Sequence, residues 1–348
     1  MRWVKIITMK RRRWIGLVGR IGVGSVLSGC TAPFTRAKVN VEAVARLGGA
    51  GYGIWQDGHV IAGRSLGGRM PSFSITKSLA ALAVVDAAGK GWIDIDRPLV
   101  DMIPEWRSDS GKRRITPRLL VNQTAGFPSG VAALYRGMIF DKGKVALSLP
   151  LIDPPGSQFR YGPASSEILA EVLRRALREH GTTTEIFLRE LMDRFGVASP
   201  HWRKDGASRF YLSTGAEFTV QDLGRLGQVV AKLANGNSFA GLNADVFLNL
   251  ASPRVPNPMV SAGLWWNRNA AKTGAFAIEP ERHLDLIRPS SFWQGACLCP
   301  AADPGWLAMV GSGGKRVYIL PSRDLVIARL DRAASWDDAA FLRAVVSV

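Results

Sequence analysis

Residues 71–91 read PSFSITKSLAALAVVDAAGKG, and this stretch decides the fold. It predicts a helix over residues 74–89 that has apolar residues on every side, so the helix should be buried all round. Ser74 and Lys77 stand three residues apart in its first turn and therefore share one face. A serine hydroxyl is a poor nucleophile without a base, and a desolvated lysine can act as that base. The pattern therefore predicts a nucleophile at Ser74, with an N-cap serine beside a surface lysine as the alternative.

Strand patterns lie at both ends of the chain. Apolar runs at residues 53–55 and 59–61 flank Asp57-Gly58, a strong hairpin signal, and further runs occupy residues 306–310, 316–320 and 325–330. A helix is expected to close the chain over residues 337–346. The predicted class is α+β: an antiparallel sheet formed from residues near 49–64 and 304–330, flanking helices, and a mainly helical insertion near 92–250.

The residues after the Ser-x-x-Lys motif carry a family resemblance. GWIDIDRPLV (residues 91–100), IPEW (103–106) and ITPRLLVNQTAG (115–126) follow it in order. Together they resemble the β-lactamase and penicillin-binding-protein serine hydrolases, in the branch with class C β-lactamases, family VIII esterases and 6-aminohexanoate-dimer hydrolases. The resemblance runs from about Gly49 to Leu330. It implies the β-lactamase/transpeptidase-like fold and acyl transfer to water through an acyl-enzyme, with an ester or amide as substrate and no metal or organic cofactor.

The second motif of that family, Tyr-x-Asn, is incomplete here. Tyr161 matches the catalytic tyrosine, and Pro163 stands where the family has asparagine. The resemblance implies that Tyr161 and Lys77 move the protons, with a tyrosinate serving first as general base and then as acid. A packed aromatic side chain is the alternative for Tyr161.

The third motif has two candidates. Lys272-Thr273-Gly274 matches the family in letters but lies in a loop-like stretch. The run Gly311-Ser312-Gly313-Gly314 lies between two predicted strands, as the family requires, and we favour it for that reason. The resemblance then implies oxyanion and substrate contacts from this run, with the N–H groups of Ser74 and Gly314 holding the oxyanion. The basic residue that opens the family motif is missing at Gly311.

Other interpretations are weaker. Gly63-Arg64-Ser65-Leu66-Gly67 matches the nucleophile elbow of α/β-hydrolases, but glycines and a proline follow it where a helix is needed. Cys297 and Cys299 lack the second pair that a metal site would need. The main rival is a catalytically degenerate envelope protein that binds a wall fragment or a partner. Hydrolysis of β-lactams themselves is doubtful because Pro163 and Gly311 lack the family's polar groups.

The first 29 residues predict an export signal. Residues 10–13 are basic, residues 14–26 are largely apolar, and Leu27-Ser28-Gly29-Cys30 resembles a bacterial lipobox. We therefore expect a lipoprotein signal peptide over residues 1–29, lipidation at Cys30, a tether over residues 30–48 and the hydrolase domain over residues 49–348. The formal net charge is +17, but no basic run interleaves with aromatic residues, so we expect a lipid-anchored envelope protein and no nucleic-acid partner.

Lipid attachment can be tested directly. Radiolabelled palmitate should enter the wild-type chain in bacterial cells, and Cys30→Ala should remove the label because the acylated thiol is gone. Equal labelling of both proteins would contradict a lipobox at this position.

Overall fold

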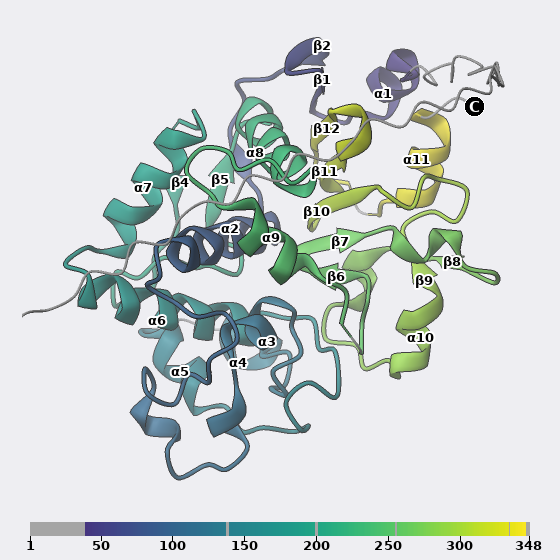
Figure 1. Cartoon of the computed structure of the whole chain (residues 1–348). Helices are drawn as coiled ribbons and strands as arrows, with labels where there is room; N and C mark the ends of the chain where they lie inside the picture. The colour runs from purple at the N-terminus through teal and green to yellow at the C-terminus, as the bar shows by residue number, and fades with distance from the viewer. Residues whose placement is uncertain (1–38, 137–138, 199–200, 255, 334, 346–348) are drawn as a thin grey trace, which may run out of the picture. The chain divides into compact units, whose positions relative to one another are not determined.

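An antiparallel sheet built from the two ends of the chain carries the fold (Figure 1). The computed structural model describes residues 39–345 except 137–138, 199–200, 255 and 334, so the predicted lipidation at Cys30 lies outside the described residues. Within them the sheet has seven strands, which lie in the order β2 (His59–Arg64), β1 (Gly51–Gln56), β12 (Leu325–Leu330), β11 (Lys315–Leu320), β10 (Leu307–Gly311), β7 (Leu264–Trp266) and β6 (Val260–Ser261). The predicted α+β class is confirmed.

The strands β1, β12, β11 and β10 are buried on both faces of the sheet. Alternate side chains on a strand point to opposite faces, so each strand contributes to two cores. Trp55, Val317 and Val326 belong to one core, which includes α8 (Val220–Ala234). Their neighbours Ile54, Tyr318 and Ile327 belong to a second core, which includes α1 (Val41–Leu47) and α11 (Asp338–Val345). Strands buried on both faces appear in the sequence as nearly continuous apolar runs, as β10, β11 and β12 do.

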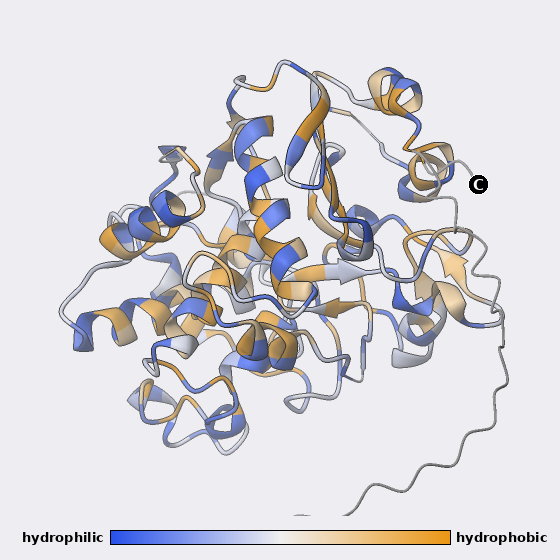
Figure 2. Ribbon diagram, turned by 45° about the horizontal axis from the view of Figure 1, so that its top comes forward, coloured by the Kyte–Doolittle hydropathy of each residue, from blue (hydrophilic) through white to orange (hydrophobic). Residues whose placement is uncertain are grey.

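Helix α2 (Ile75–Gly89) lies between the sheet and the helical region (Figure 1). It contacts β10 on one side and helices of the insertion on the other, so thirteen of its fifteen residues are buried. Many ribbons elsewhere in the molecule alternate between hydrophilic and hydrophobic stretches (Figure 2). Further α-helices are α3 (Pro117–Val121), α4 (Val131–Tyr135), α5 (Lys142–Ser148), α6 (Ala164–Glu179), α7 (Thr184–Arg194), α9 (Ala244–Ala251) and α10 (Ser290–Gly295).

Three features differ from the sequence prediction. Part of the expected tether is helix α1, which Asn40 caps by accepting the Ala43 N–H at 2.9 Å, and its apolar face is buried in the second core. Strands β6 and β7 extend the main sheet beyond β10. A small sheet of β3 (Met70–Pro71), β5 (Ala216–Phe218) and β4 (His201–Trp202) interrupts the helical insertion. No helix among the described residues is long and apolar enough to cross a membrane.

A buried ion pair fastens the C-terminal helix to the sheet. Arg316 on β11 has no exposed surface, and its guanidinium donates two hydrogen bonds to Asp338, at 2.8 and 2.9 Å. The hydroxyl of Tyr318 donates to the same carboxylate, and Glu281 contacts the guanidinium at 2.9 Å. Removing one member of such a cluster leaves an unpaired charge in the interior, which costs more than the intact pair contributes.

Asp338→Ala should therefore lower the free energy of unfolding by about 3–5 kcal/mol. Chemical denaturation of wild type and variant measures the difference. Asp101→Ala is the control: its partner Arg97 is exposed, so the loss should stay below about 1 kcal/mol. A similar small loss for both variants would show that the buried cluster does not fasten α11.

Candidate active site

Ser74 stands at the N-terminus of α2, on a segment held by the small sheet. Ser72 is fully buried, and both its N–H and its hydroxyl donate to the carbonyl of Ala216, at 2.9 and 2.7 Å. The N–H of Ala216 in turn donates to Thr76 Oγ1 at 3.2 Å. Residues on both sides of Ser74 are thus attached to β5, which fixes the position of the serine hydroxyl.

The residue before Ser74 has an unusual backbone conformation. Phe73 has a φ of 49°, in the left-handed region that non-glycine residues seldom adopt. Such a conformation costs of order 1–3 kcal/mol and persists only where the surroundings enforce it. The hydrogen bonds of Ser72 supply that enforcement, and the turn places Ser74 at the first turn of α2.

Lys77 is the base that the sequence predicts. Its Nζ lies 2.9 Å from Ser74 Oγ and also donates to the carbonyl of Ser213 at 2.9 Å. The side chain is 7% exposed, and burial lowers the pKa of Lys77 to about 7, against a smaller opposing effect of the Glu167 charge. A large fraction of Lys77 is therefore neutral near pH 7 and able to accept the serine proton.

Tyr161 faces the same pair. The Lys77 Nζ is 5.2 Å from the centre of its ring, and Trp265 packs edge-on against that ring at 5.4 Å. Burial raises the pKa of Tyr161 to about 12, although a hydrogen bond with Ser74 holds the value down. The phenol is therefore protonated at neutral pH in the resting site and can donate a proton, and the tyrosinate that the family resemblance implies would have to form during the reaction.

The four residues of the third motif have different surroundings in the structure. Gly311 ends β10 beside Ser74: a Cβ on it would lie 2.2 Å from the carbonyl oxygen of Ser72, so no side chain fits there. Ser312 follows at the exposed turn. The N–H groups of Gly313 and Gly314 both donate to the carboxylate of Glu281, at 2.8 and 3.2 Å. The Gly314 N–H is thus bonded to Glu281 in this structure, which differs from the oxyanion contact expected of it.

Sequence reasoning missed two residues at the site. Gln123 lines the same narrow pocket as Ser74, Lys77 and Tyr161, a cavity of ≈ 20 Å³. Its amide accepts the Gly162 N–H at 3.2 Å and thereby supports the loop that carries Tyr161. Glu167 lies behind Lys77 on α6. Gln123 lies within the run of residues 115–126 that resembles the family. Nothing in that run indicates its φ of 60° or its place in the lining of the pocket.

The rejected alternatives lie elsewhere. Ser65 is exposed, and no helix begins after it. Lys272 donates to the carbonyl of Gln294 at 3.0 Å and is absent from the residues that line the Ser74 pocket. Neither contributes to the cluster around Ser74.

A family model described as Beta-lactamase matches residues 38–344. The chain belongs to the β-lactamase family. No curated protein matches the sequence significantly.

Solved structures of this family share the fold at low identity. A β-lactamase from Mycobacterium bovis has 17% identity and a TM-score of 0.59, covering 87% of this chain and 96% of its own. A penicillin-binding protein homologue from Caulobacter crescentus has 15% identity and a TM-score of 0.57, with coverage of 85% and 90%. EstCE1, a hydrolase with promiscuous acyltransferase activity, has 13% identity and a TM-score of 0.61, with coverage of 85% and 93%. These likenesses establish the fold, and the family supports a hydrolase.

The pKa values give a pH prediction. The rate at which a fluorophosphonate labels Ser74 should rise with pH through a midpoint near 7, since Lys77 must lose its proton to accept that of Ser74. Tyr161, whose pKa is raised to about 12, should add no inflection in the neutral range. Mass spectrometry of the labelled peptide measures the rate. A midpoint near the ordinary lysine value would remove Lys77 as the base.

Proposed function

We propose that this β-lactamase-family protein is a serine hydrolase that cleaves esters or linear amides through an acyl-enzyme on Ser74. The observation that carries the proposal is the 2.9 Å hydrogen bond between Lys77 Nζ and Ser74 Oγ in a pocket dry enough to lower the lysine pKa to about 7. Burial alone could produce a low pKa, but burial together with a hydroxyl at the start of a helix describes an activated nucleophile.

The proton path follows from the geometry. Neutral Lys77 accepts the Ser74 proton as Oγ forms a bond to the substrate carbonyl carbon, giving a tetrahedral oxyanion. Tyr161, protonated at neutral pH, gives a proton to the leaving oxygen or nitrogen as its bond to carbon breaks, and it is reprotonated from Lys77. Water then attacks the acyl-enzyme carbonyl by the same steps in reverse, releasing the acid and restoring Ser74.

Backbone N–H groups would hold the oxyanion. That of Ser74 lies at the N-terminal end of α2, where the helix dipole favours negative charge. We propose Ser312 for the second, because its neighbour Gly311 touches the Ser72 backbone and Val310 lines the pocket. The absence of a side chain at Gly311 is what allows β10 to approach so closely.

The surroundings favour neutral substrates over β-lactams. A β-lactam carboxylate needs a cation, and three residues near the third motif could have supplied one. Arg316 is fully buried with Asp338, Lys315 donates to the carbonyls of Ser312 and Asp331 at 3.1 and 2.6 Å, and Lys272 lies outside the pocket. Pro163 offers no amide to the substrate side chain. Each missing charge-assisted contact is worth roughly 1.5–3 kcal/mol.

We also propose that the protein is held at the bacterial envelope by lipid on Cys30. The basic, apolar and small order of residues 10–30 supports this location. The substrate would then be a small ester or amide that reaches the envelope, and nucleic acid has no part in the activity.

Substrate choice and nucleophile can be tested on one preparation. Hydrolysis of p-nitrophenyl butyrate should have a higher kcat/KM than hydrolysis of nitrocefin, and Ser74→Ala should abolish both.

Tyr161→Phe should lower turnover by about 10²- to 10⁴-fold, the usual effect of a lost acid–base group. A higher value for nitrocefin would favour a β-lactamase. Full activity in Ser74→Ala would place the nucleophile elsewhere, and a folded protein that neither turns over nor labels would be a binding protein.

A further inference from the structure

A carboxylate behind the active site is connected to Lys77 through one residue. Glu167 lies in the first turn of α6 and is 2% exposed. Its Oε1 accepts the backbone N–H of Ser213 at 3.0 Å, and the carbonyl of Ser213 accepts the Lys77 Nζ at 2.9 Å. Glu167 therefore controls the segment that holds the inner side of Lys77, while Ser74 holds the outer side.

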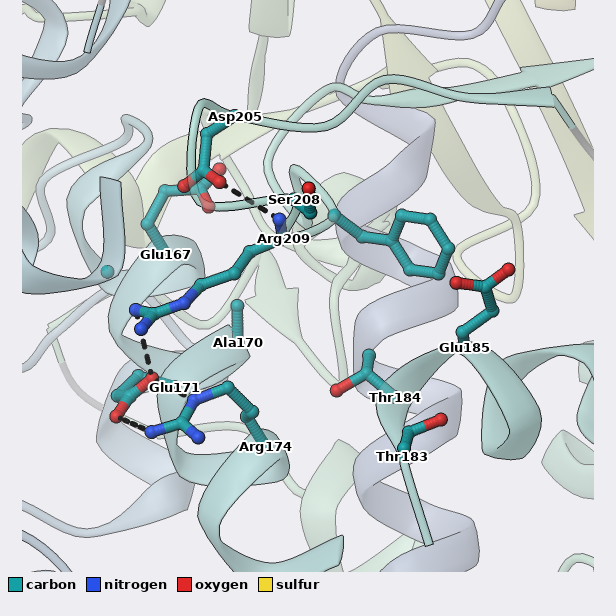
Figure 3. Close-up of a pocket in the computed structure, with 12 residues that line it drawn as sticks. Glu167, Ala170, Glu171, Arg174, Thr183, Thr184, Glu185, Asp205, Ser208 and Arg209 are labelled. Atoms are coloured by element: carbon teal, nitrogen blue, oxygen red, sulfur yellow. Dashed lines mark hydrogen bonds and ion pairs between the residues drawn. The ribbon is translucent and has the colours of Figure 1, made fainter. Parts of the chain in front are cut away.

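Glu167 does not face the substrate. It is absent from the lining of the Ser74 pocket and lines instead a separate cavity of ≈ 260 Å³ (Figure 3). Ala170, Asp205 and Arg209 also line that cavity, whereas Lys77 and Ser74 do not. A hydrolytic water bound to Glu167 would lie away from the acyl-enzyme, so a general-base role in deacylation does not fit this position.

Charged and titratable groups face Glu167 from several elements. Lys77 comes from α2, Lys142 from α5, Tyr135 from α4 and Tyr211 from the loop before β5. Burial raises the pKa of Glu167, and hydrogen bonds from Ser213 together with the charges of Lys142 and Lys77 oppose that rise. Tyr161 also faces Lys77.

We infer that Glu167 is a positioning residue for Lys77, which it acts on by its charge and by its hydrogen bond to Ser213. This inference rests on the proposed function, because it assigns Glu167 a part in activating Ser74. The Coulombic attraction of the Glu167 carboxylate for the Lys77 ammonium opposes the desolvation that lowers the lysine pKa. Glu167 thus keeps Lys77 close to the neutral range, where it can both accept and return a proton.

The test replaces the charge and keeps the shape. Glu167→Gln retains a carbonyl oxygen for the Ser213 N–H but removes the negative charge. The midpoint of the pH profile for fluorophosphonate labelling of Ser74 should move down by about 1 pH unit, the lower end of what a nearby opposite charge produces. Labelling needs no knowledge of the natural substrate.

Glu171→Gln is the matched control. It lies one turn further along α6, is also buried, and is paired with Arg174 and Arg175 at 2.6 and 2.7 Å. It should lower stability but leave the labelling midpoint at the wild-type value. An equal shift in both variants would mean a general effect of charge on the helix and would overturn the assignment.

Two further outcomes separate this inference from the proposed function. If wild-type Ser74 is not labelled at any pH, the proposed function fails first. If it is labelled normally and folded Glu167→Gln keeps the wild-type midpoint, Glu167 has only a structural role and the inference fails alone. Glu167→Met provides a second neutral variant in case the glutamine variant does not fold. Circular dichroism shows which variant is folded, and the labelling midpoint of that variant should move down in the same way.

Discussion

The site depends on the burial of one lysine side chain. An ammonium group removed from water strongly favours its neutral form, and Lys77 is kept out of water by α2, the Ser213 segment and the ring of Tyr161. That environment exists only because α2 is apolar on every side and is enclosed by the sheet and the insertion together. The chemistry is therefore a property of the whole packing arrangement as much as of the residues that touch Ser74.

Much of this arrangement could be predicted from the sequence. The candidate site residues Ser74, Lys77 and Tyr161 follow from local motifs, and the sheet strands follow from continuous apolar runs. The direction of the Gly314 N–H could not be predicted, because it is determined by Glu281, which is 33 residues away and carries no motif. Lys77 and Glu167 also lie far apart in the chain, and their relationship depends on a third segment at Ser213.

Some errors came from weak local signals. Helix α1 has only seven residues, so it gives little sequence signal and depends on its packing against α11, β1 and β2 for stability. Strands β4 to β7 have two or three residues each, too few for a period-two pattern. The protonation of Tyr161 at rest could not be predicted for a different reason: family likeness carries over the residue but not the burial that raises its pKa to about 12.

The pairing of β1 with β12 has a consequence for biosynthesis. Gly51 is opposite Leu330, so β1 can pair with β12 only after the segment that forms β12 has been synthesised. Pairings this distant in sequence close slowly, since the chain loses entropy before the contacts repay it. Val310, which lines the pocket beside Ser74, belongs to the segment that precedes β12. The segment that carries Ser74 is therefore synthesised long before the strands that enclose it, and the pocket around Ser74 cannot form until β10 is present.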